Sequence, residues 1–248
     1  MSKAAAIIPA RWRSTRFPGK PLHLIAGKPL LQHVWQRCKR AKTLDSVIIA
    51  TDDMRIVRAA FGWGAEVALT SARHRTGTDR IAEVARSAAR FDIIVNVQGD
   101  EPLIDPKLID RVVKKLGSDR KIDIVTAAHP FGDAAEASSP HQVKVAVDRN
   151  GGARDFFRAP PAAKKDRALK ILRHQGIYGF RRATLLKFVK LQQSPRELAE
   201  SLEQLRALEN GVNVHVLLTK HGSPGVDTPA DAKTLDRQLR RAKRAGSR

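Results

Sequence analysis

The sequence is poor in cysteine and in long apolar runs, and both shortages restrict what the protein is. Its 248 residues include a single cysteine, Cys38, which excludes an intramolecular disulfide framework and a cysteine-rich zinc site. Such cysteine usage is typical of a reducing compartment, and we expect a cytoplasmic protein. No apolar run approaches the ~20 residues of a membrane-spanning helix. Only five consecutive apolar residues lie between Lys3 and Pro9, too few for the core of a secretory signal.

Acidic residues are scarce relative to basic ones. The 46 lysines and arginines exceed the 25 acids and give a net charge of +21, which favours nucleotides, acidic sugars, nucleic acid or anionic membranes as partners. A generally basic proteome or a solubility device explains the excess equally well. Residues 237–248 hold six basic residues and no acid, and we interpret them as a basic C-terminal tail. Nucleic acid is the less favoured partner because helix-turn-helix, zinc-finger and RRM patterns are lacking.

The first half of the chain alternates strand patterns with helix patterns. Hydrophobic residues make up 42% of the sequence, enough for a full core. The strand patterns are apolar without alternation, which is typical of parallel strands that are covered on both faces. This order predicts a doubly wound α/β fold with a mostly parallel sheet. We expect strands at residues 4–9, 46–51, 66–69 and 92–97, and helices at residues 30–42, 54–61, 78–89 and 106–116.

The second half is less regular, although the length still predicts one domain over residues 1–248. Residues 135–182 are rich in strand patterns, and we interpret them as a β-rich insertion. Gly211 is placed to end one helix, and Thr228 to begin the last one. We expect strands at residues 122–128, 143–147, 153–158, 170–180 and 213–218, and helices at residues 185–191, 196–210 and 229–244.

Two aspartates and a basic loop are the most informative features. Asp100 and Asp227 each follow an apolar, strand-like run at a point where the chain turns, and ligands of open α/β sheets bind at such carboxyl-end turns. The loop at residues 9–21 follows the first strand and includes Arg11 and Lys20. Paired carboxylates hold Mg²⁺, and cationic side chains hold phosphate. We therefore expect an enzyme acting on a nucleoside triphosphate, with these four side chains in one cleft.

Each of these residues also has a structural interpretation. Asp100 fits a turn residue, and Asp227 fits a helix cap, although Asp105 before Pro106 is the better cap of its region. The basic loop is not a Walker loop, because Lys20 is followed by proline rather than by serine or threonine. The joint occurrence of both aspartates with the loop favours the functional interpretation.

Six segments together resemble the CMP-Kdo synthetase (3-deoxy-manno-octulosonate cytidylyltransferase) family. The opening loop alone is shared more loosely with other sugar nucleotidyltransferases, whereas the whole set is specific. The resemblance covers about residues 4–235. The segments are Ile-Ile-Pro-Ala-Arg through Phe-Pro-Gly-Lys-Pro at 7–21, His-Arg-Thr-Gly-Thr-Asp-Arg at 74–80, Asn-Val-Gln-Gly-Asp-Glu-Pro at 96–102, Arg-His-Gln-Gly-Ile-Tyr-Gly-Phe at 173–180, Leu-Glu-Gln-Leu-Arg at 202–206, and Gly-Val-Asp-Thr-Pro at 225–229.

The resemblance implies a Rossmann-like fold of the nucleotide-diphospho-sugar transferase type, with a β-rich arm at residues 135–182 used for homodimerisation. It implies that 3-deoxy-D-manno-octulosonate (Kdo) and CTP react to CMP-Kdo and pyrophosphate, with Mg²⁺, for lipopolysaccharide or capsule synthesis. The partners would be CTP and a 3-deoxy-ulosonic acid. A related acceptor, 8-amino-Kdo or a nonulosonic acid such as sialic acid, is the alternative.

The resemblance also assigns site residues. The catalytic set would be Arg11 and Lys20 on the triphosphate, with Asp100 and Asp227 on Mg²⁺. The nucleotide site would comprise Ala10, Arg11, Lys20, Arg73, His74, Thr76, Gly77 and Gln98. The sugar site would comprise Arg16, Arg158, His174, Tyr178, Glu203 and Gln204.

Some of these assignments have competing explanations or departures from the family. A histidine such as His174 is commonly structural, and Tyr178, the only tyrosine, fits packing as well as a substrate contact. Residues 159–168 depart from the family pattern beside the expected sugar site, which leaves the acceptor and Arg158 open. The sequence also leaves open the number of Mg²⁺ ions, the base of the nucleotide and the role of the tail.

Overall fold

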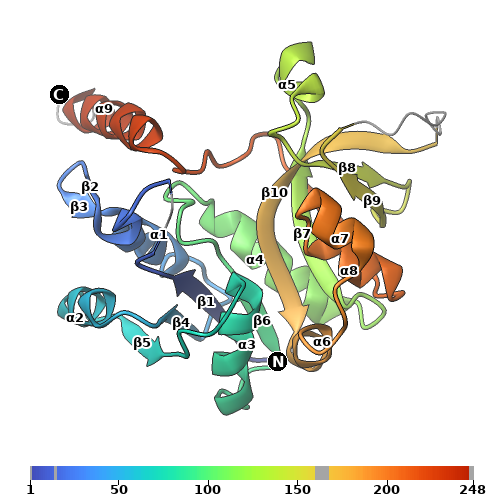
Figure 1. Ribbon diagram of the computed structural model, residues 1–248, viewed down its shortest axis with the longest axis horizontal. Helices are drawn as coiled ribbons and strands as arrows, with labels where there is room; N and C mark the ends of the chain where they lie inside the picture. The colour runs from blue at the N-terminus through green and yellow to red at the C-terminus, as the bar shows by residue number, and fades with distance from the viewer. Residues whose placement is uncertain (1, 14–15, 160–167, 246–248) are drawn as a thin grey trace. The chain divides into compact units, whose positions relative to one another are not determined.

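A computed structural model describes residues 2–13, 16–159 and 168–245. The chain divides into two compact units (Figure 1). Unit 1 comprises Met1–Lys3, Arg90–Val95 and Arg111–Gly222, and unit 2 comprises Ala4–Ala89, Asn96–Asp110 and Ser223–Arg248.

Unit 2 is built on three parallel strands, β1 (Ala4–Ala10), β4 (Ser46–Thr51) and β5 (Glu66–Leu69), in the order β1-β4-β5. Residues 4–8 have no exposed surface, which explains why this segment is apolar without alternation. The helices of the unit are α1 (Leu30–Cys38), α2 (Met54–Gly62) and α3 (Gly77–Ser87). The three strands match the expected ranges within one residue, and the helices match within a few.

Strand β6 (Ile93–Asn96) and helix α4 (Pro106–Ser118) each have residues in both units. Beyond β6, the amide of Val97 donates a hydrogen bond to the carbonyl of Ile7 in β1. The turn at residues 98–100 therefore follows directly beside β1, at the carboxyl end of the parallel strands.

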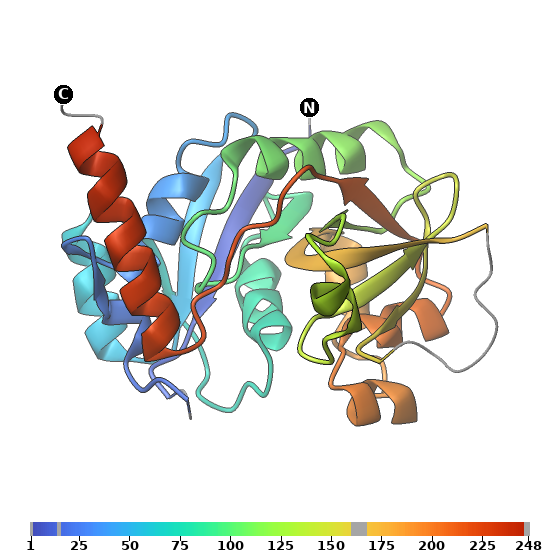
Figure 2. The ribbon, with the colours of Figure 1, turned by 90° about the horizontal axis from the view of Figure 1, so that it is seen from above.

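The last helix, α9 (Pro229–Ala245), packs in unit 2 against β2 (Leu24–Ile25) (Figure 2). Strand β2 forms a hairpin with β3 (Lys28–Pro29), which the sequence patterns did not predict. A buried core cluster thereby links residues over two hundred positions apart, and it holds Asp227 near the basic loop. The cluster consists of Phe17, Ile25, Leu30, Val226, Ala232 and Leu235.

Unit 1 contains a mixed set of strands. Strand β7 (Ile124–His129) pairs with β11 (Val214–Leu218) in parallel and with β10 (Lys170–Arg181) antiparallel. Strand β8 (Lys144–Val147) lies antiparallel between β10 and β9 (Ala153–Phe157). The expected β-rich segment at 135–182 thus holds three strands, while residues 160–167 of the atypical loop lie outside the described residues. The helices are α5 (Ala134–Ser138), α6 (Arg182–Phe188), α7 (Pro195–Glu200) and α8 (Gln204–Glu209).

The single helix expected at residues 196–210 is wrong. The segment forms α7 and α8, which are separated where Ser201 has a left-handed φ of 52°. The break lets the Glu197 carboxylate accept a 2.8 Å hydrogen bond from Arg206 Nε in a buried ion pair. In one continuous helix these residues would lie about 13.5 Å apart along the axis, beyond the reach of such a pair. Leu198, expected on the apolar face, is exposed instead.

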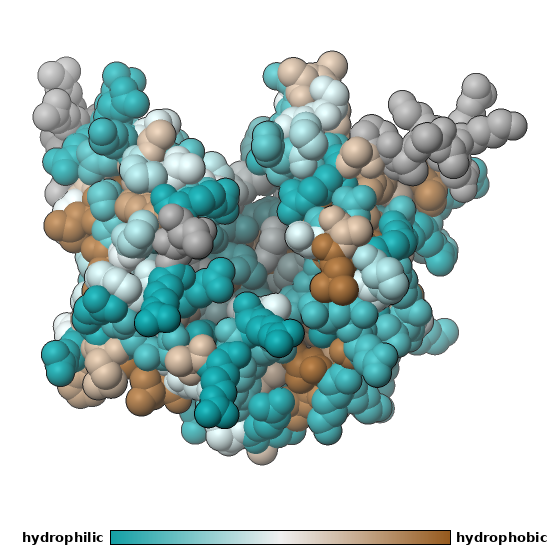
Figure 3. All heavy atoms as spheres, in the orientation of Figure 1, coloured by the Kyte–Doolittle hydropathy of each residue, from teal (hydrophilic) through white to brown (hydrophobic). Residues whose placement is uncertain are grey.

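The hydrophilic surface agrees with the high content of charged residues in the sequence. The face in Figure 3 is mainly hydrophilic, with hydrophobic side chains in scattered groups. Among the described residues, no helix combines the length and apolar character that crossing a membrane requires.

Candidate active site

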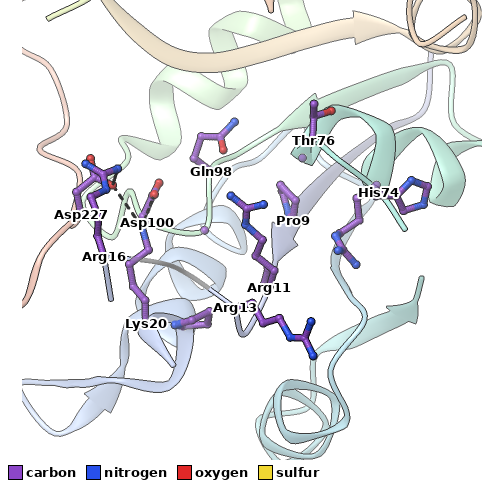
Figure 4. A pocket seen from close by; sticks show the side chains of 15 residues that line it. Pro9, Arg11, Arg13, Arg16, Lys20, His74, Thr76, Gln98, Asp100 and Asp227 are labelled. Carbon is purple, nitrogen blue, oxygen red and sulfur yellow. Dashed lines mark hydrogen bonds and ion pairs between the residues drawn. The ribbon is translucent and has the colours of Figure 1, made fainter. Parts of the chain in front are cut away.

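A pocket of about 340 Å³ lies in unit 2 at the carboxyl end of β1 (Figure 4). Ligand pockets usually have a volume of about 300–1,000 Å³. Four segments line it: the loop after β1, the start of α3, the turn after β6, and Asp227 before α9. The expectation that Arg11, Lys20, Asp100 and Asp227 converge in one cleft therefore agrees with the structure.

Lys20 lies between the two aspartates. Its Nζ is 2.7 Å from Asp100 Oδ2 and 3.5 Å from Asp227 Oδ1. The same ammonium donates a 3.0 Å hydrogen bond to the carbonyl of Val226. Its side chain is only 15% exposed, so the cation is enclosed by these oxygens. The two carboxylates thus contact the same ammonium although they are 127 residues apart in the sequence.

The basic loop folds back on itself to place Lys20. Gly19 has a φ of 70°, and a Cβ there would lie 3.1 Å from the Trp12 ring. Its amide donates a hydrogen bond to the carbonyl of Trp12, and the guanidinium of Arg55 lies 3.7 Å from the centre of the indole ring. Glycine therefore suits both the left-handed backbone and the close approach. Lys20 begins the short 3-10 turn of Lys20–Leu22.

Asp100 is fixed by close backbone contacts. A Cβ on the preceding Gly99 would lie 2.9 Å from the carbonyl oxygen of Pro9, so the turn presses directly against β1. The carbonyl of Asp100 accepts a 2.9 Å hydrogen bond from the amide of Val226. Helix α4 is capped separately, because Asp105 accepts a bond from the amide of Lys107. The carboxylate of Asp100 is therefore available to the pocket.

Asp227 is likewise not the cap of the last helix. Thr228 and Asp231 cap α9 reciprocally: the threonine hydroxyl accepts from the amide of Asp231, whose carboxylate accepts from the amides of Thr228 and Asp227. The Asp227 carboxylate instead forms a 3.2 Å ion pair with Arg16 besides its contact with Lys20. Both aspartates thus direct their carboxylates to cations at the pocket.

The opposite end of the pocket is formed by the start of α3. Thr76 and Asp79 make a capping box, and a Cβ on Gly77 would lie 3.2 Å from the Pro9 ring. His74 contacts Glu83, and this hydrogen bond lowers the pKa of the Glu83 carboxyl. Among the predicted nucleotide residues, Ala10, Arg11, Lys20, His74, Thr76, Gly77 and Gln98 line the pocket. Arg73 is exposed and is not among the described lining residues.

Two cationic lining residues, Arg13 and Arg80, are absent from the expected site residues. Arg80 is buried; it donates a 2.6 Å bond to the hydroxyl of Thr70 and pairs with Asp52 at 3.2 Å. Arg80 is the last residue of the segment 74–80 that matched the family, and Arg13 lies in the basic loop, so both belong to segments that the sequence singled out. In all, five arginine and lysine residues face two aspartates in the lining, a balance that favours a polyanionic ligand.

The aspartate pair fits Mg²⁺. In the described parts of the chain, no cluster of three or more histidine, cysteine or acidic residues could hold a metal. Mg²⁺ commonly binds through one or two carboxylates, completed by water and substrate phosphates. Because one ammonium contacts both carboxylates, Asp100 and Asp227 are placed to share a cation.

Five of the six residues expected at the sugar site belong to unit 1, whereas Arg16 lines the pocket of unit 2. His174 and Tyr178 are neighbours on β10, with ring centres 5.4 Å apart. His174 Nε2 lies 2.9 Å from the hydroxyl of Thr126, and desolvation by burial lowers the pKa of His174 to about 3. The imidazole is therefore neutral at physiological pH.

The remaining three residues lie around α7 and α8. Arg158 Nε donates a 3.0 Å bond to the carbonyl of Glu200, and its amide donates to the carboxylate of the same residue. Glu203 and Gln204 begin α8, with Glu203 3.7 Å from Arg206. Arg158 is thus held at the end of α7, while the sugar-binding roles of all six residues stay predictions.

Comparison with known proteins gives a consistent result. Residues 5–216 match the model of the family described as cytidylyltransferase. A 3-deoxy-manno-octulosonate cytidylyltransferase of Geobacter metallireducens is 45% identical over 251 residues, covering 96% of this chain and 98% of that protein. One from Leptospira biflexa is 46% identical over 230 residues, covering 92% and 93%.

Solved structures agree with the fold. A CMP:2-keto-3-deoxy-manno-octonic acid synthetase complexed with CTP superimposes with a TM-score of 0.91 and 38% identity, covering 97% of this chain and 100% of that one. A 4-diphosphocytidyl-2C-methyl-D-erythritol synthase from Anaerococcus prevotii is 16% identical, with a TM-score of 0.63 and coverage of 96% and 99%; this likeness concerns the fold alone. The Rossmann-like α/β class expected from the sequence is confirmed.

Proposed function

The chain belongs to the cytidylyltransferase family, and from this premise we propose that it transfers the cytidylyl group of CTP to Kdo, releasing pyrophosphate. It is a nucleotidyltransferase. The observation that carries the proposal is the convergence of Lys20, Asp100 and Asp227 in one cationic pocket. The 38% identity to a structure complexed with CTP supports the choice of nucleotide.

In this reaction the anomeric hydroxyl of Kdo attacks the α-phosphorus in line with the departing pyrophosphate. Negative charge on the phosphoryl oxygens and the leaving group has to be stabilised, with little covalent work for the protein. Arg11 and Lys20 would bind the triphosphate, and Asp100 and Asp227 would hold Mg²⁺. When bound, Mg²⁺ supplies charge neutralisation and a template for the triphosphate.

We assign the nucleoside to the end of the pocket near α3. His74, Thr76 and Gly77 line the pocket there, Ala10 and Gln98 line it from β1 and the turn after β6, and the amide of Gln98 offers both a donor and an acceptor to a base edge. Arg73 completes the proposed set by resemblance. The buried guanidinium of Arg80 adds positive charge to the same lining.

We assign the acceptor sugar to Arg16, Arg158, His174, Tyr178, Glu203 and Gln204. Since His174 is neutral, it would serve as a hydrogen-bonding partner, and the charge that balances the sugar carboxylate would come from an arginine. We further propose a cytoplasmic homodimer that uses the 135–182 arm and supplies CMP-Kdo for lipopolysaccharide or capsule synthesis. The basic tail at 237–248 has no assigned role, and residues 246–248 lie outside the described residues.

The decisive experiment is a matrix of nucleoside triphosphates against sugar acids, with Mg²⁺ and a pyrophosphate-release readout. CTP with Kdo should give the highest kcat/KM, and 8-amino-Kdo or a nonulosonic acid should react less well. Absence of turnover with every 3-deoxy-ulosonic acid would refute the proposal. A preference for one of the other acids would retain the nucleotide site and replace the acceptor.

The roles of the aspartates need separate variants. Asp100→Asn and Asp227→Asn should each lower kcat by at least about a hundredfold, as the loss of a charge-stabilising group commonly does, with the fold retained. Asp53→Asn is the matched control, because Asp53 caps α2 outside the pocket and asparagine caps equally well. Full activity of either pocket variant would contradict its assignment.

A further inference from the structure

The ammonium of Lys20 is held at the proposed metal site by two hydrogen bonds and a longer ion pair. A lysine ammonium has three N–H donors and no acceptor. Three oxygens surround Nζ, from Asp100 at 2.7 Å, Val226 at 3.0 Å and Asp227 at 3.5 Å. The neighbouring Arg16 has a side chain that is 67% exposed, compared with 15% for Lys20. Lys20 is therefore the enclosed partner of the two carboxylates.

A divalent ion on the same carboxylates would compete with this arrangement. Mg²⁺ binds carboxylate oxygens at about 2.0–2.1 Å. If it took Asp100 Oδ2 while Lys20 kept its position, the two cations would lie within about 5 Å of each other. Like charges at such a distance repel strongly where solvent is partly excluded. The carboxylates therefore favour one cation at a time.

Binding of Lys20 to the triphosphate would also draw its ammonium away from the two carboxylates. The ammonium donates to Asp100 and Val226 and lies 3.5 Å from Asp227, so moving to a triphosphate oxygen takes it away from these partners. Binding the phosphate would therefore free the carboxylates.

We propose that Lys20 is an internal counter-ion that competes with the divalent metal for Asp100 and Asp227 and transfers to the triphosphate as the metal binds. The inference rests on the proposed function and adds the control of metal binding at that site. Metal alone binds weakly, because it has to displace the lysine. Metal together with nucleotide binds tightly, because the displaced ammonium gains a new anionic partner.

This exchange couples the two ligands. If CTP raises the affinity for metal by drawing Lys20 away, then metal raises the affinity for CTP by the same factor. Removing the lysine charge should abolish the competition, so metal binding to the nucleotide-free protein becomes tighter and its coupling to CTP becomes smaller. A lysine that only binds phosphate would leave the affinity for metal alone unchanged.

The test is a titration of nucleotide-free protein with Mn²⁺ alone, which suits the same oxygen ligands as Mg²⁺. Free Mn²⁺ is followed by electron paramagnetic resonance. Lys20→Met should lower the Kd for Mn²⁺ by roughly fivefold relative to the wild type, the factor expected from losing a competing ion pair of ordinary strength. Lys20→Arg retains the charge and should show no such gain, and Asp100→Asn should weaken binding.

Lys39→Met is the matched control, because Lys39 is exposed at the end of α1 and does not line the pocket. The Kd of this control for Mn²⁺ should equal that of the wild type.

Circular dichroism verifies folding. If Lys20→Met fails to fold, Lys20→Gln replaces it, because the glutamine amide retains a donor for the Val226 carbonyl. Equal or weaker Mn²⁺ binding in the folded neutral variant overturns the inference. Failure of the proposed function is distinguishable, because it appears as absent turnover in the wild type, whereas this titration contains neither sugar nor nucleotide.

Discussion

Gly99→Ala tests whether the turn that carries Asp100 must press against β1. A Cβ at residue 99 would lie 2.9 Å from the carbonyl oxygen of Pro9, closer than side-chain carbons normally approach an oxygen. Because that oxygen belongs to the backbone of a buried strand, the turn rather than the strand should move, by a few tenths of an ångström. Overpacking of this kind costs about 1–3 kcal/mol of stability. Asp100 would shift with the turn, and a shift that approaches 1 Å lowers activity up to about a hundredfold.

The matched control is Gly62→Ala, because a Cβ at this position, at the end of α2, meets nothing within 4 Å. Alanine there should be neutral or slightly stabilising. Urea unfolding reports the stability of both variants, and pyrophosphate release with CTP and Kdo reports their kcat. Gly99→Ala should be less stable than Gly62→Ala and at least about tenfold less active, since Asp100 is proposed to act on the developing charge. If the two variants match in stability and kcat, the reasoning about this contact is refuted.

Three further predictions concern other parts of the chain. Glu197→Gln should lower the free energy of unfolding by about 3–5 kcal/mol, because it breaks a buried ion pair with Arg206; a loss below about 1 kcal/mol in urea unfolding would contradict this. Burial lowers the pKa of His174 to about 3 in the folded protein. Between about pH 6.5 and 3, His174 is therefore protonated in the unfolded chain but not in the folded one. The free energy of unfolding should fall as the pH drops through this range, by up to about 1.4 kcal/mol per pH unit. Melting curves of His174→Asn should show a smaller slope over this range, and an unchanged slope would argue against the lowered pKa. Burial raises the pKa of the Cys38 thiol, so Ellman's reagent should label it only after unfolding; rapid labelling of the native protein would show that the helix face opens.

The sequence predicted those parts of the fold that depend on local pattern. Strands β4 and β5 were placed at their observed ends, because buried parallel strands are apolar throughout and end at turn residues. The cap at Thr228 followed from a side chain that accepts a bond from a nearby amide. The place of Asp100 followed from one topological rule, that ligand sites form at the carboxyl ends of parallel strands. Asp227 reaches the same pocket differently, because it lies nine residues beyond the end of β11 and just before α9.

The parts that were missed depend on contacts between distant residues. The division of residues 196–210 into two helices depends on the buried pair of Glu197 and Arg206, whereas the leucine spacing alone fits one helix. Arg80 is held in the pocket lining by its contacts with Thr70 and Asp52, and no local sequence pattern reveals these contacts. The hairpin of β2 and β3 has strands of only two residues each, too short for any periodicity.

The packing of α9 against the beginning of the chain has a consequence for biosynthesis. Phe17 and Ile25 share a core cluster with Val226, Ala232 and Leu235, so a segment synthesised early is buried by one synthesised about two hundred residues later. Domains generally begin to fold from the N-terminal side during translation, but this cluster has to await residues 226–235. A nascent chain that lacks those residues would therefore leave the cluster open and would not hold Asp227 beside Asp100.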